Sequence, residues 1–227
     1  MYKLIAVLYR RSDLTHDDFV AYWEKHGHFV VNKIPGLRRY VQNHRVDLKG
    51  YETQIDGIAE EWFDDLRSLQ HYYNLLKSGA FEIKPLLIDN TQFIDTSRME
   101  YCLTEEHVFK PESYTDYKLM SILYRRTGLT HEEFIKYWKE EHGPFAIKLI
   151  PGARRYVQNH PVSLSGYKTE IDGIAEVWFD NIDAIRDYWK WRNTDAAKPM
   201  LDDEKKFSER SRRWQLLLAK EIVIKEK

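Results

Sequence analysis

Apolar residues recur along the chain with two different periods, and the change of period marks where strands give way to helices. Residues 4–10, LIAVLYR, are rich in strand-forming residues and run into a turn at Ser12 and Asp13. Thr15 and Asp18 match a capping box, which predicts that a helix begins there. The next apolar positions have helical spacing, so one helix face is expected to carry three aromatic residues and a histidine: Phe19, Tyr22, Trp23 and His26.

The pattern after this helix predicts three more strands and a second helix. Residues 34–36, IPG, end the helical region, and RRYVQNH at residues 38–44 reads as a strand. DGIAEEWFD at residues 56–64 predicts another strand after a long polar loop. A second helix is expected over residues 64–78, and the last strand over residues 100–108. The resulting order, β-α-β-β-α-β, is that of the ferredoxin-like split βαβ unit.

The same pattern occurs twice in the chain. Residues 3–23 are similar in sequence to residues 118–138, and RRYVQNH occurs again unchanged at residues 154–160. The offset between the copies grows by one between Trp23 and His26, because the second copy has one more residue before its histidine. A match of this length at a nearly constant offset indicates a duplicated fold.

The duplication predicts the domain organisation and the fold class. Each copy has the size of one small domain, so we expect domains at residues 1–110 and 116–227 with a polar linker between them. A four-stranded antiparallel sheet with helices on one face leaves its other face bare. We therefore predict an α+β protein of two tandem ferredoxin-like βαββαβ domains, packed sheet-to-sheet as an intrachain dimeric α/β barrel. Further association into a homo-oligomer remains open.

Composition narrows the classes of function. The 227 residues include 35 lysines and arginines and 36 acidic residues, a balance that argues against binding of nucleic acid or of an anionic membrane. The single cysteine, Cys102, rules out an internal disulfide, and no signal-peptide pattern opens the chain, so a cytoplasmic location is expected. An aromatic content of 14% suits either a flat, partly apolar ligand or simply an aromatic core.

Two equivalent histidines are the first candidates for chemistry. His26 and His142 are expected at the exposed end of the aromatic helix, each followed by a glycine. A histidine there titrates near neutrality and can act as a general acid or base. The alternative is a purely structural cation that interacts with the last carbonyl groups of the helix.

The repeated heptapeptide supplies the other candidates. Alternation along a strand places its first, third, fifth and seventh residues on one face, which is polar and aromatic rather than apolar. This face can line a pocket, or it can form hydrogen bonds that fix the joint between the two halves. On the pocket interpretation, tyrosine and histidine are catalytic and arginine and glutamine bind substrate, together with Trp23 and Trp138, which are otherwise core residues. The residues concerned are Arg38, Tyr40, Gln42 and His44, and in the second copy Arg154, Tyr156, Gln158 and His160.

Two pairs of carboxylates have simpler interpretations. Asp56 and Asp172 precede glycine, which favours a role in a turn. Glu60 and Glu176 lie on the third strand of each copy, where a carboxylate can orient an imidazole or pair with the arginines of the heptapeptide.

The combined motifs resemble a known family. LYRRxxLTHEEFxxYWxxxHGP, followed by PGxRRYVQNH and DGIAExWFD, is similar to the EthD family of dimeric α/β-barrel proteins, once in each half. Members are usually single-copy homodimers, so the chain resembles a fused tandem version. The resemblance implies a small-molecule protein: some relatives in the superfamily are cofactor-free cyclases, dehydratases or decarboxylases that act on polyketides, and others bind haem.

The two copies differ where the family pattern has His-x-Pro. The second copy keeps it as His142, Gly143 and Pro144, whereas the first has a histidine, His28, in place of the proline. Proline is expected to hold the preceding glycine extended and so to fix the chain beside the imidazole. We therefore expect the second site to be the more active, although its extra residue shifts the phase of His142.

Motifs for phosphate loops, serine hydrolases and zinc proteases are absent from the sequence. We therefore hypothesise a lyase- or cyclase-type enzyme without cofactor or metal, which dehydrates, decarboxylates or cyclises a small aromatic or polyketide-like metabolite. Histidine would abstract a proton while tyrosine stabilises the enolate oxygen. Two alternatives stay open: a non-catalytic carrier of a hydrophobic aromatic metabolite, and a haem-binding or haem-degrading protein.

Overall fold

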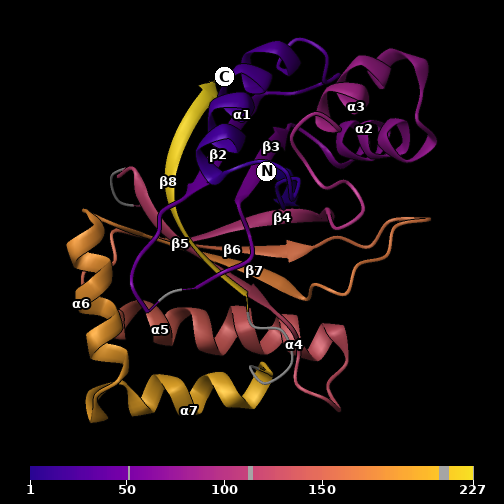
Figure 1. Ribbon diagram of the computed structural model, residues 1–227. Helices are drawn as coiled ribbons and strands as arrows, with labels where there is room; N and C mark the ends of the chain where they lie inside the picture. Colours follow the sequence, from indigo (N-terminus) through magenta and orange to yellow (C-terminus); the bar gives the residue numbers. More distant parts are fainter. Residues whose placement is uncertain (51, 112–114, 210–214, 227) are drawn as a thin grey trace. The chain divides into compact units, whose positions relative to one another are not determined.

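The computed structural model describes residues 1–50, 52–111, 115–209 and 215–226. Figure 1 traces the chain, which divides into two compact units. Unit 1 comprises residues 1–105, 162–167 and 221–227, and unit 2 comprises residues 106–161 and 168–220. Both units combine antiparallel strands with helices, which confirms the predicted α+β class. The division into domains at residues 1–110 and 116–227 and their sheet-to-sheet packing stay predictions.

Unit 1 contains a sheet in which β1 lies between β3 and β4, and β2 pairs with the other edge of β3. Its second helix is followed by a short 3₁₀ turn and a third helix that the sequence pattern did not predict. The elements are β1 (Tyr2–Leu8), α1 (His16–Val30), β2 (Arg39–Arg45), β3 (Gly57–Phe63), α2 (Leu66–Ser78), η1 (Phe81–Ile83), α3 (Lys84–Asn90) and β4 (Glu100–Pro111). Strand β4 belongs to unit 1 as far as Glu105.

Unit 2 repeats this arrangement, with β5 between β7 and β8 and with β6 on the other edge of β7. Helices α4, α5 and α7 lie on one side of its strands (Figure 1). The elements are β5 (Tyr117–Leu123), α4 (His131–Tyr137), the π-helical turn η2 (Trp138–His142), α5 (Gly143–Leu149), β6 (Arg155–Pro161), β7 (Gly173–Phe179), α6 (Ile182–Arg192), η3 (Asp195–Ala197), α7 (Lys198–Phe207) and β8 (Gln215–Lys225). Strand β8 belongs to unit 2 as far as Lys220.

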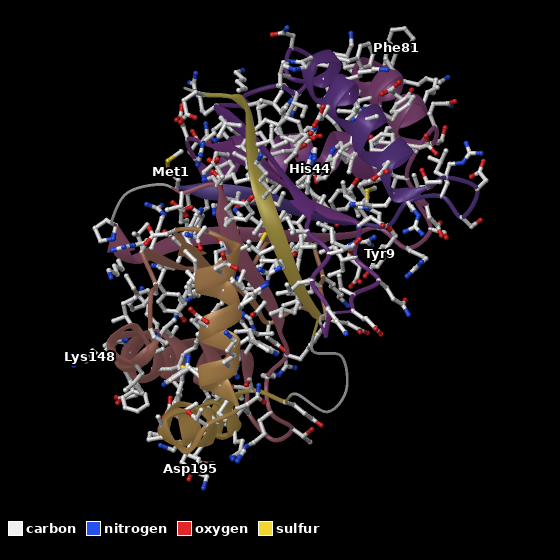
Figure 2. The ribbon with its side chains drawn as sticks, turned by 60° about the vertical axis from the view of Figure 1, so that its left-hand side comes forward. Met1, Tyr9, His44, Phe81, Lys148 and Asp195 are labelled. Atoms are coloured by element: carbon white, nitrogen blue, oxygen red, sulfur yellow. The ribbon has the colours of Figure 1, made fainter. Side chains whose placement is uncertain are left out.

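The aromatic face of the first helix packs onto the sheet in each unit, and side chains fill the space between them (Figure 2). Both helices begin at the predicted capping box, on Thr15 and on Thr130. The indole of Trp23 lies against the first residue of β3, so that a Cβ added to Gly57 would come within 2.3 Å of its ring. Glycine at this position is therefore required by the close approach of the indole, and not only by a turn.

The first helix does not end at the histidine, contrary to the sequence-based expectation. Helix α1 continues past His26 to Val30, and α5 continues the second copy past His142. Both histidines are only 6% exposed. The expected exposed position at a helix end is therefore wrong, because the apolar face of the helix extends one more turn.

The extra residue of the second copy is absorbed in the π-helical turn η2. Its last hydrogen bond runs from the Gly143 amide to the carbonyl of Trp138, five residues earlier. Gly143 itself is helical, with φ −57° and ψ −55°, and Pro144 lies in the first turn of α5. The expected extended glycine is therefore wrong, and Pro144 does not favour the second site in the way that was expected.

Among the described residues, none of the helices combines the length and the apolar character needed to cross a lipid bilayer.

Candidate functional site

In unit 1, His26 belongs to a hydrogen-bonded chain that joins helices α1 and α3. Its Nδ1 lies 2.5 Å from Oδ2 of Asp89, and the hydroxyl of Tyr22 donates to Oδ1 of the same carboxylate at 2.9 Å. Tyr22 and His26 reach one carboxylate because residues four apart share a helix face. The ring of Phe93 packs against the imidazole, with centroids 4.9 Å apart. The histidine is therefore held in one orientation by a carboxylate and an aromatic ring.

Unit 2 builds the same arrangement from equivalent residues. Nδ1 of His142 lies 2.8 Å from Oδ2 of Asp203, and the Tyr137 hydroxyl donates to Oδ1 at 2.6 Å. Phe207 packs against the imidazole at 4.7 Å between centroids. Tyr137 and His142 are five residues apart rather than four, and the π turn brings them to one carboxylate. The shift in phase expected from the extra residue is thus cancelled, and π turns of this kind are frequent at functional sites.

The two aspartates were not predicted from the sequence. Asp89 lies on α3 and Asp203 on α7, short helices that each follow a 3₁₀ turn and carry proline in their first turn. A signal was present, because both copies contain Lys-Pro-x-Leu-x-Asp, at residues 84–89 and at residues 198–203. Extending the repeat to these segments would have found the partner of each histidine.

Burial and the aspartate act in opposite directions on the pKa of His26. Desolvation lowers this pKa, and the hydrogen bond and charge of Asp89 raise it by less, so the net pKa lies below the usual value. A neutral ring that donates from Nδ1 to a carboxylate keeps its Nε2 lone pair, which makes Nε2 the basic atom. In unit 2, the hydrogen bond from His142 is the largest cause that lowers the pKa of Asp203, so this carboxylate stays ionised.

The tyrosines of the repeated heptapeptide face the same helices. The indole Nε1 of Trp23 donates to the hydroxyl oxygen of Tyr40 at 3.2 Å, and Nε2 of Gln158 donates to that of Tyr156 at 3.0 Å. Burial raises the pKa of both phenols, so that they stay protonated. Because each oxygen accepts a hydrogen bond, its own proton can be donated to a ligand.

A small cavity between sheet and helices brings several of the predicted residues together in each unit. The cavity of unit 2 has a volume of about 60 Å³, and His142, Trp138 and Tyr156 are part of its lining. The equivalent cavity of unit 1 has a volume of about 30 Å³ and is lined in part by the matching residues His26, Trp23 and Tyr40.

The glutamines and the second histidines of the heptapeptide lie on the same face but are not among the residues lining these cavities. In unit 1, Nε2 of Gln42 donates to the carbonyl of Trp23 at 2.6 Å, and its Oε1 lies 2.9 Å from Nε2 of His44. His44 stacks on the Trp23 indole at 4.8 Å and lies inside the unit (Figure 2). These side chains anchor the strand to the helix.

The same contacts recur in unit 2. Nε2 of Gln158 donates to the carbonyl of Trp138, and Oε1 of Gln158 lies 2.9 Å from Nε2 of His160. Burial first, and then the nearby ring of His107, lower the pKa of His160 to about 3. His160 is therefore neutral across the physiological range. Its environment gives little support to the predicted role as a second acid–base group.

The arginines that open the heptapeptide lie elsewhere. Nε of Arg38 donates to Asp64 at 2.5 Å and Nε of Arg154 donates to Asp180 at 2.8 Å, and all four side chains are about half exposed. Neither arginine is part of the cavity linings. The geometry gives their predicted contact with substrate no support.

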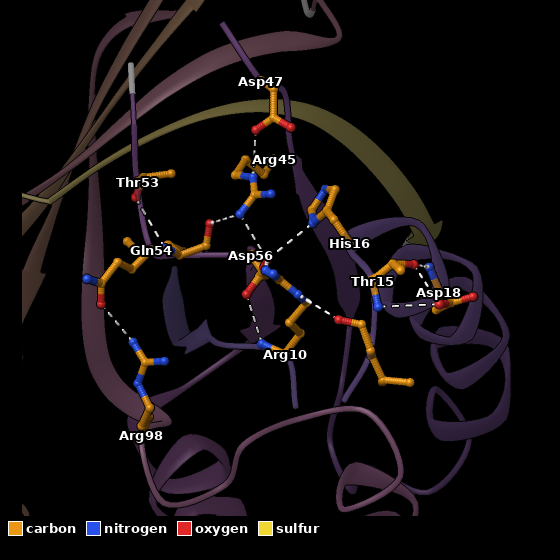
Figure 3. A network of polar contacts seen from close by, with 12 residues as sticks. Arg10, Thr15, His16, Asp18, Arg45, Asp47, Thr53, Gln54, Asp56 and Arg98 are labelled. Atoms are coloured by element: carbon orange, nitrogen blue, oxygen red, sulfur yellow. Dashed lines mark hydrogen bonds and ion pairs between the residues drawn. The ribbon is translucent and has the colours of Figure 1, made fainter. Parts of the chain in front are cut away.

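The carboxylates that the sequence assigned to turns form a buried clamp, shown for unit 1 in Figure 3. Asp56 accepts hydrogen bonds from the backbone and guanidinium of Arg10 at 2.9 and 2.6 Å and from Arg45 at 2.9 Å, and Nδ1 of His16 lies 3.2 Å away. These bonds outweigh burial and lower the pKa of Asp56 to about 2. Asp172 is held in the same way by Arg125 and His131. The clamp ties the start of the first helix to the sheet.

The glutamates of the third strand form buried bonds with a lysine and an asparagine of the neighbouring strands. Glu60 accepts from Lys3 and from Asn43, both at 2.9 Å, and all three side chains are fully buried. Glu176 makes the same bonds with Lys118 and Asn159. These bonds give the predicted roles, orienting an imidazole or pairing with the heptapeptide arginines, no support.

Comparison with known proteins places the chain in a family. The model of the EthD domain matches residues 11–97 and again residues 126–211. A search of curated proteins gives no match.

Solved structures of low sequence identity share the fold. An anthrone oxidase-like protein is 13% identical, with 100% of this chain and 94% of the other covered and a TM-score of 0.68. A monooxygenase-like protein from Fusobacterium nucleatum subsp. nucleatum is 10% identical, with 100% and 98% covered and a TM-score of 0.58. A mutant chlorite dismutase from Candidatus Nitrospira defluvii is 10% identical, with 98% and 92% covered and a TM-score of 0.51. These likenesses concern the fold, and the two family matches show that the chain belongs to the EthD family, with one EthD domain in each half of its sequence.

Proposed function

We propose that the protein is an enzyme that works by proton transfer without a cofactor, as a lyase or cyclase acting on a small aromatic or polyketide-like molecule. The observation that carries this proposal is a buried histidine that is hydrogen-bonded to an aspartate beside a cavity, an arrangement built twice in one chain. His142 with Asp203 is the base in unit 2, and His26 with Asp89 is its counterpart in unit 1. A place in a catabolic or secondary-metabolite pathway belongs to the same proposal.

The chemistry follows from the hydrogen bonds. The aspartate accepts from Nδ1, which leaves Nε2 as the atom that takes a proton from substrate, and its charge stabilises the imidazolium that forms. The buried tyrosine, Tyr156 or Tyr40, donates its proton to an oxygen on which negative charge develops. The acid–base part of such a site contributes a rate factor of about 10²–10⁴.

The lining of the cavity supports an aromatic or apolar ligand. In unit 2 it combines Trp138 and Phe207 with aliphatic residues of β5 such as Leu119. The volume of about 60 Å³ is smaller than the roughly 150 Å³ of a cavity that admits benzene. A ring can therefore enter only if the cavity widens on binding, and a haem, which is several times larger than benzene, does not fit beside either histidine.

The test is a screen of three substrate classes, one for each reaction type. Enolisable aryl ketones report proton exchange, aromatic β-hydroxyketones report dehydration, and aromatic β-keto acids report decarboxylation. For any compound turned over in unit 2, His142→Gln is expected to lower kcat by about 10²–10⁴-fold and Tyr156→Phe by less. His28→Gln is the matched control, because this exposed histidine lies outside the site.

Two other outcomes would replace the proposal. Binding of aromatic compounds that is unchanged in His142→Gln, with no turnover in any class, would identify a carrier. A Soret band on titration with haem that is lost when both His26 and His142 are changed to alanine would identify a haem protein, in spite of the small cavities.

A further inference from the structure

The two cavities differ at one position of the third strand. Strands β3 and β7 have nearly the same sequence, GIAEEWF and GIAEVWF, so that Glu61 in unit 1 corresponds to Val177 in unit 2. Both residues line the cavity of their unit. Unit 1 therefore has a carboxyl group where unit 2 has an aliphatic side chain.

Glu61 is buried without compensation. It is 7% exposed, and its Oε2 has no hydrogen-bond partner among the residues that the structure describes. The neighbouring strands place Glu61 directly across from Tyr40 in the β2–β3 register. A buried polar atom without a partner costs free energy, so its presence beside a cavity indicates a group that the ligand satisfies.

The surroundings favour the neutral acid. The cavity around Glu61 is also lined by Tyr72, Tyr101 and His26, and its described lining includes no lysine or arginine. Burial raises the pKa of Glu61 to about 8, and the Glu61 carboxyl in turn contributes to the raised pKa of the nearby phenols. At neutral pH the side chain is therefore a carboxylic acid, which donates a hydrogen bond.

Unit 2 does not offer the same group in another place. Arg192 there occupies the position of Leu76, and its guanidinium forms a two-point pair with Glu204 at 3.0 and 2.9 Å. Both charges of this pair are compensated by each other. The acid at Glu61 is thus a property of unit 1 and not of the family pattern that the two halves share.

We propose that the cavity of unit 1 binds a carbonyl group, with Glu61 as the acid that protonates the carbonyl oxygen and His26 as the base that removes the proton from the neighbouring carbon. This inference rests on the proposed role of His26. The cavity of about 30 Å³ exceeds the roughly 10–15 Å³ that a water molecule needs, so it has room for one oxygen atom of a ligand before it widens.

The proton step balances within the site. Nε2 of His26 takes the α-proton, the C–H electron pair forms the C=C bond of the enol, and the carbonyl oxygen takes the proton of Glu61. The enzyme then holds an imidazolium and a carboxylate. The reverse transfer, to the same carbon or to a conjugated one, restores both groups and yields exchange or isomerisation with no other reactant.

The first experiment measures the acid directly. In protein labelled with carbon-13 at the glutamate carboxyl, one resonance is expected to titrate near pH 8 and to be missing from Glu61→Gln. Glu61→Val, which copies unit 2, should lose the same resonance and serves if the glutamine variant does not fold. Titration of every glutamate below a pH of about 6 would overturn the proposal.

The second experiment uses acetophenone as the carbonyl probe. Its addition is expected to shift the Glu61 resonance, and loss of its methyl proton signal in D₂O is expected to slow at least tenfold in Glu61→Gln. An unshifted resonance, or equal exchange in wild type and Glu61→Gln, would overturn the inference. Failure of the proposed function is distinguished from this, because it is measured by His142→Gln on substrates of unit 2.

Discussion

His142 and Asp203 are joined through Nδ1 and Oδ2 at 2.8 Å, at the end of a π turn that no other part of the described chain repeats. His26 and Asp89 make the same bond from a regular α-helix. One inserted residue has thus been accommodated without loss of the pair. The two backbones differ, but both place the imidazole within hydrogen-bond distance of the aspartate. The two halves therefore share the position of the imidazole rather than the form of the helix that carries it.

The π turn and Pro144 depend on each other. In a regular helix the residue at this place bonds to the carbonyl four residues earlier, which proline cannot do. Deleting Glu141, so that the second copy has the length of the first, is expected to lower the free energy of unfolding by about 3 kcal/mol. Adding Pro144→His, the residue of the first copy, should recover most of this loss. Urea unfolding of wild type, the deletion and the combined variant measures the loss and its recovery, and a deletion that is harmless on its own would contradict the linkage.

Glu61 predicts an unusual dependence of stability on pH. Its pKa in the folded protein is about 8, against an ordinary value of 4.5, so the folded state holds a proton that the unfolded state has lost between these limits. The free energy of unfolding should therefore fall as pH rises from about 5 to about 8, with a slope on the order of 1.4 kcal/mol per pH unit. Glu61→Gln removes this contribution. Parallel pH profiles of wild type and variant would contradict the assignment.

The contact between Trp23 and Gly57 predicts a strong effect of a single methyl group. Gly57→Ala places Cβ about 2.3 Å from the indole, and Gly173→Ala does the same to Trp138. Each is expected to lower stability by about 1–3 kcal/mol through overpacking. Combining Gly57→Ala with Trp23→Leu should cost less than the sum of the two changes. Thermal unfolding of the single and double variants measures this, and strict additivity would show that the indole does not touch the strand.

Much of this fold could be predicted, because its first helices and its strands follow simple sequence patterns. The capping boxes at Thr15 and Thr130 and the alternation in RRYVQNH led to elements that the structure contains. Helices α3 and α7 were missed because they are short, begin after a 3₁₀ turn and have no side-chain cap. Without them, the partners of the histidines could not be found.

The site was predicted in part for a similar reason. Alternation correctly placed Tyr40, Gln42 and His44 on one face, but it does not tell how far along a strand a cavity extends. Tyr40 lines the cavity, whereas His44 packs beside Trp23. Glu61 was not predicted because the candidate residues were those that both copies share, whereas Glu61 differs from its counterpart Val177.

The two buried histidines that are hydrogen-bonded to Asp89 and Asp203 are the proposed catalytic bases. The most direct measurement is kcat, on a compound found in the three-class screen, for the double variant His26→Gln and His142→Gln against the control His28→Gln. The double variant is expected to lose about 10²–10⁴-fold in kcat while its melting temperature stays near that of the control. Turnover that is retained in the folded double variant would contradict it.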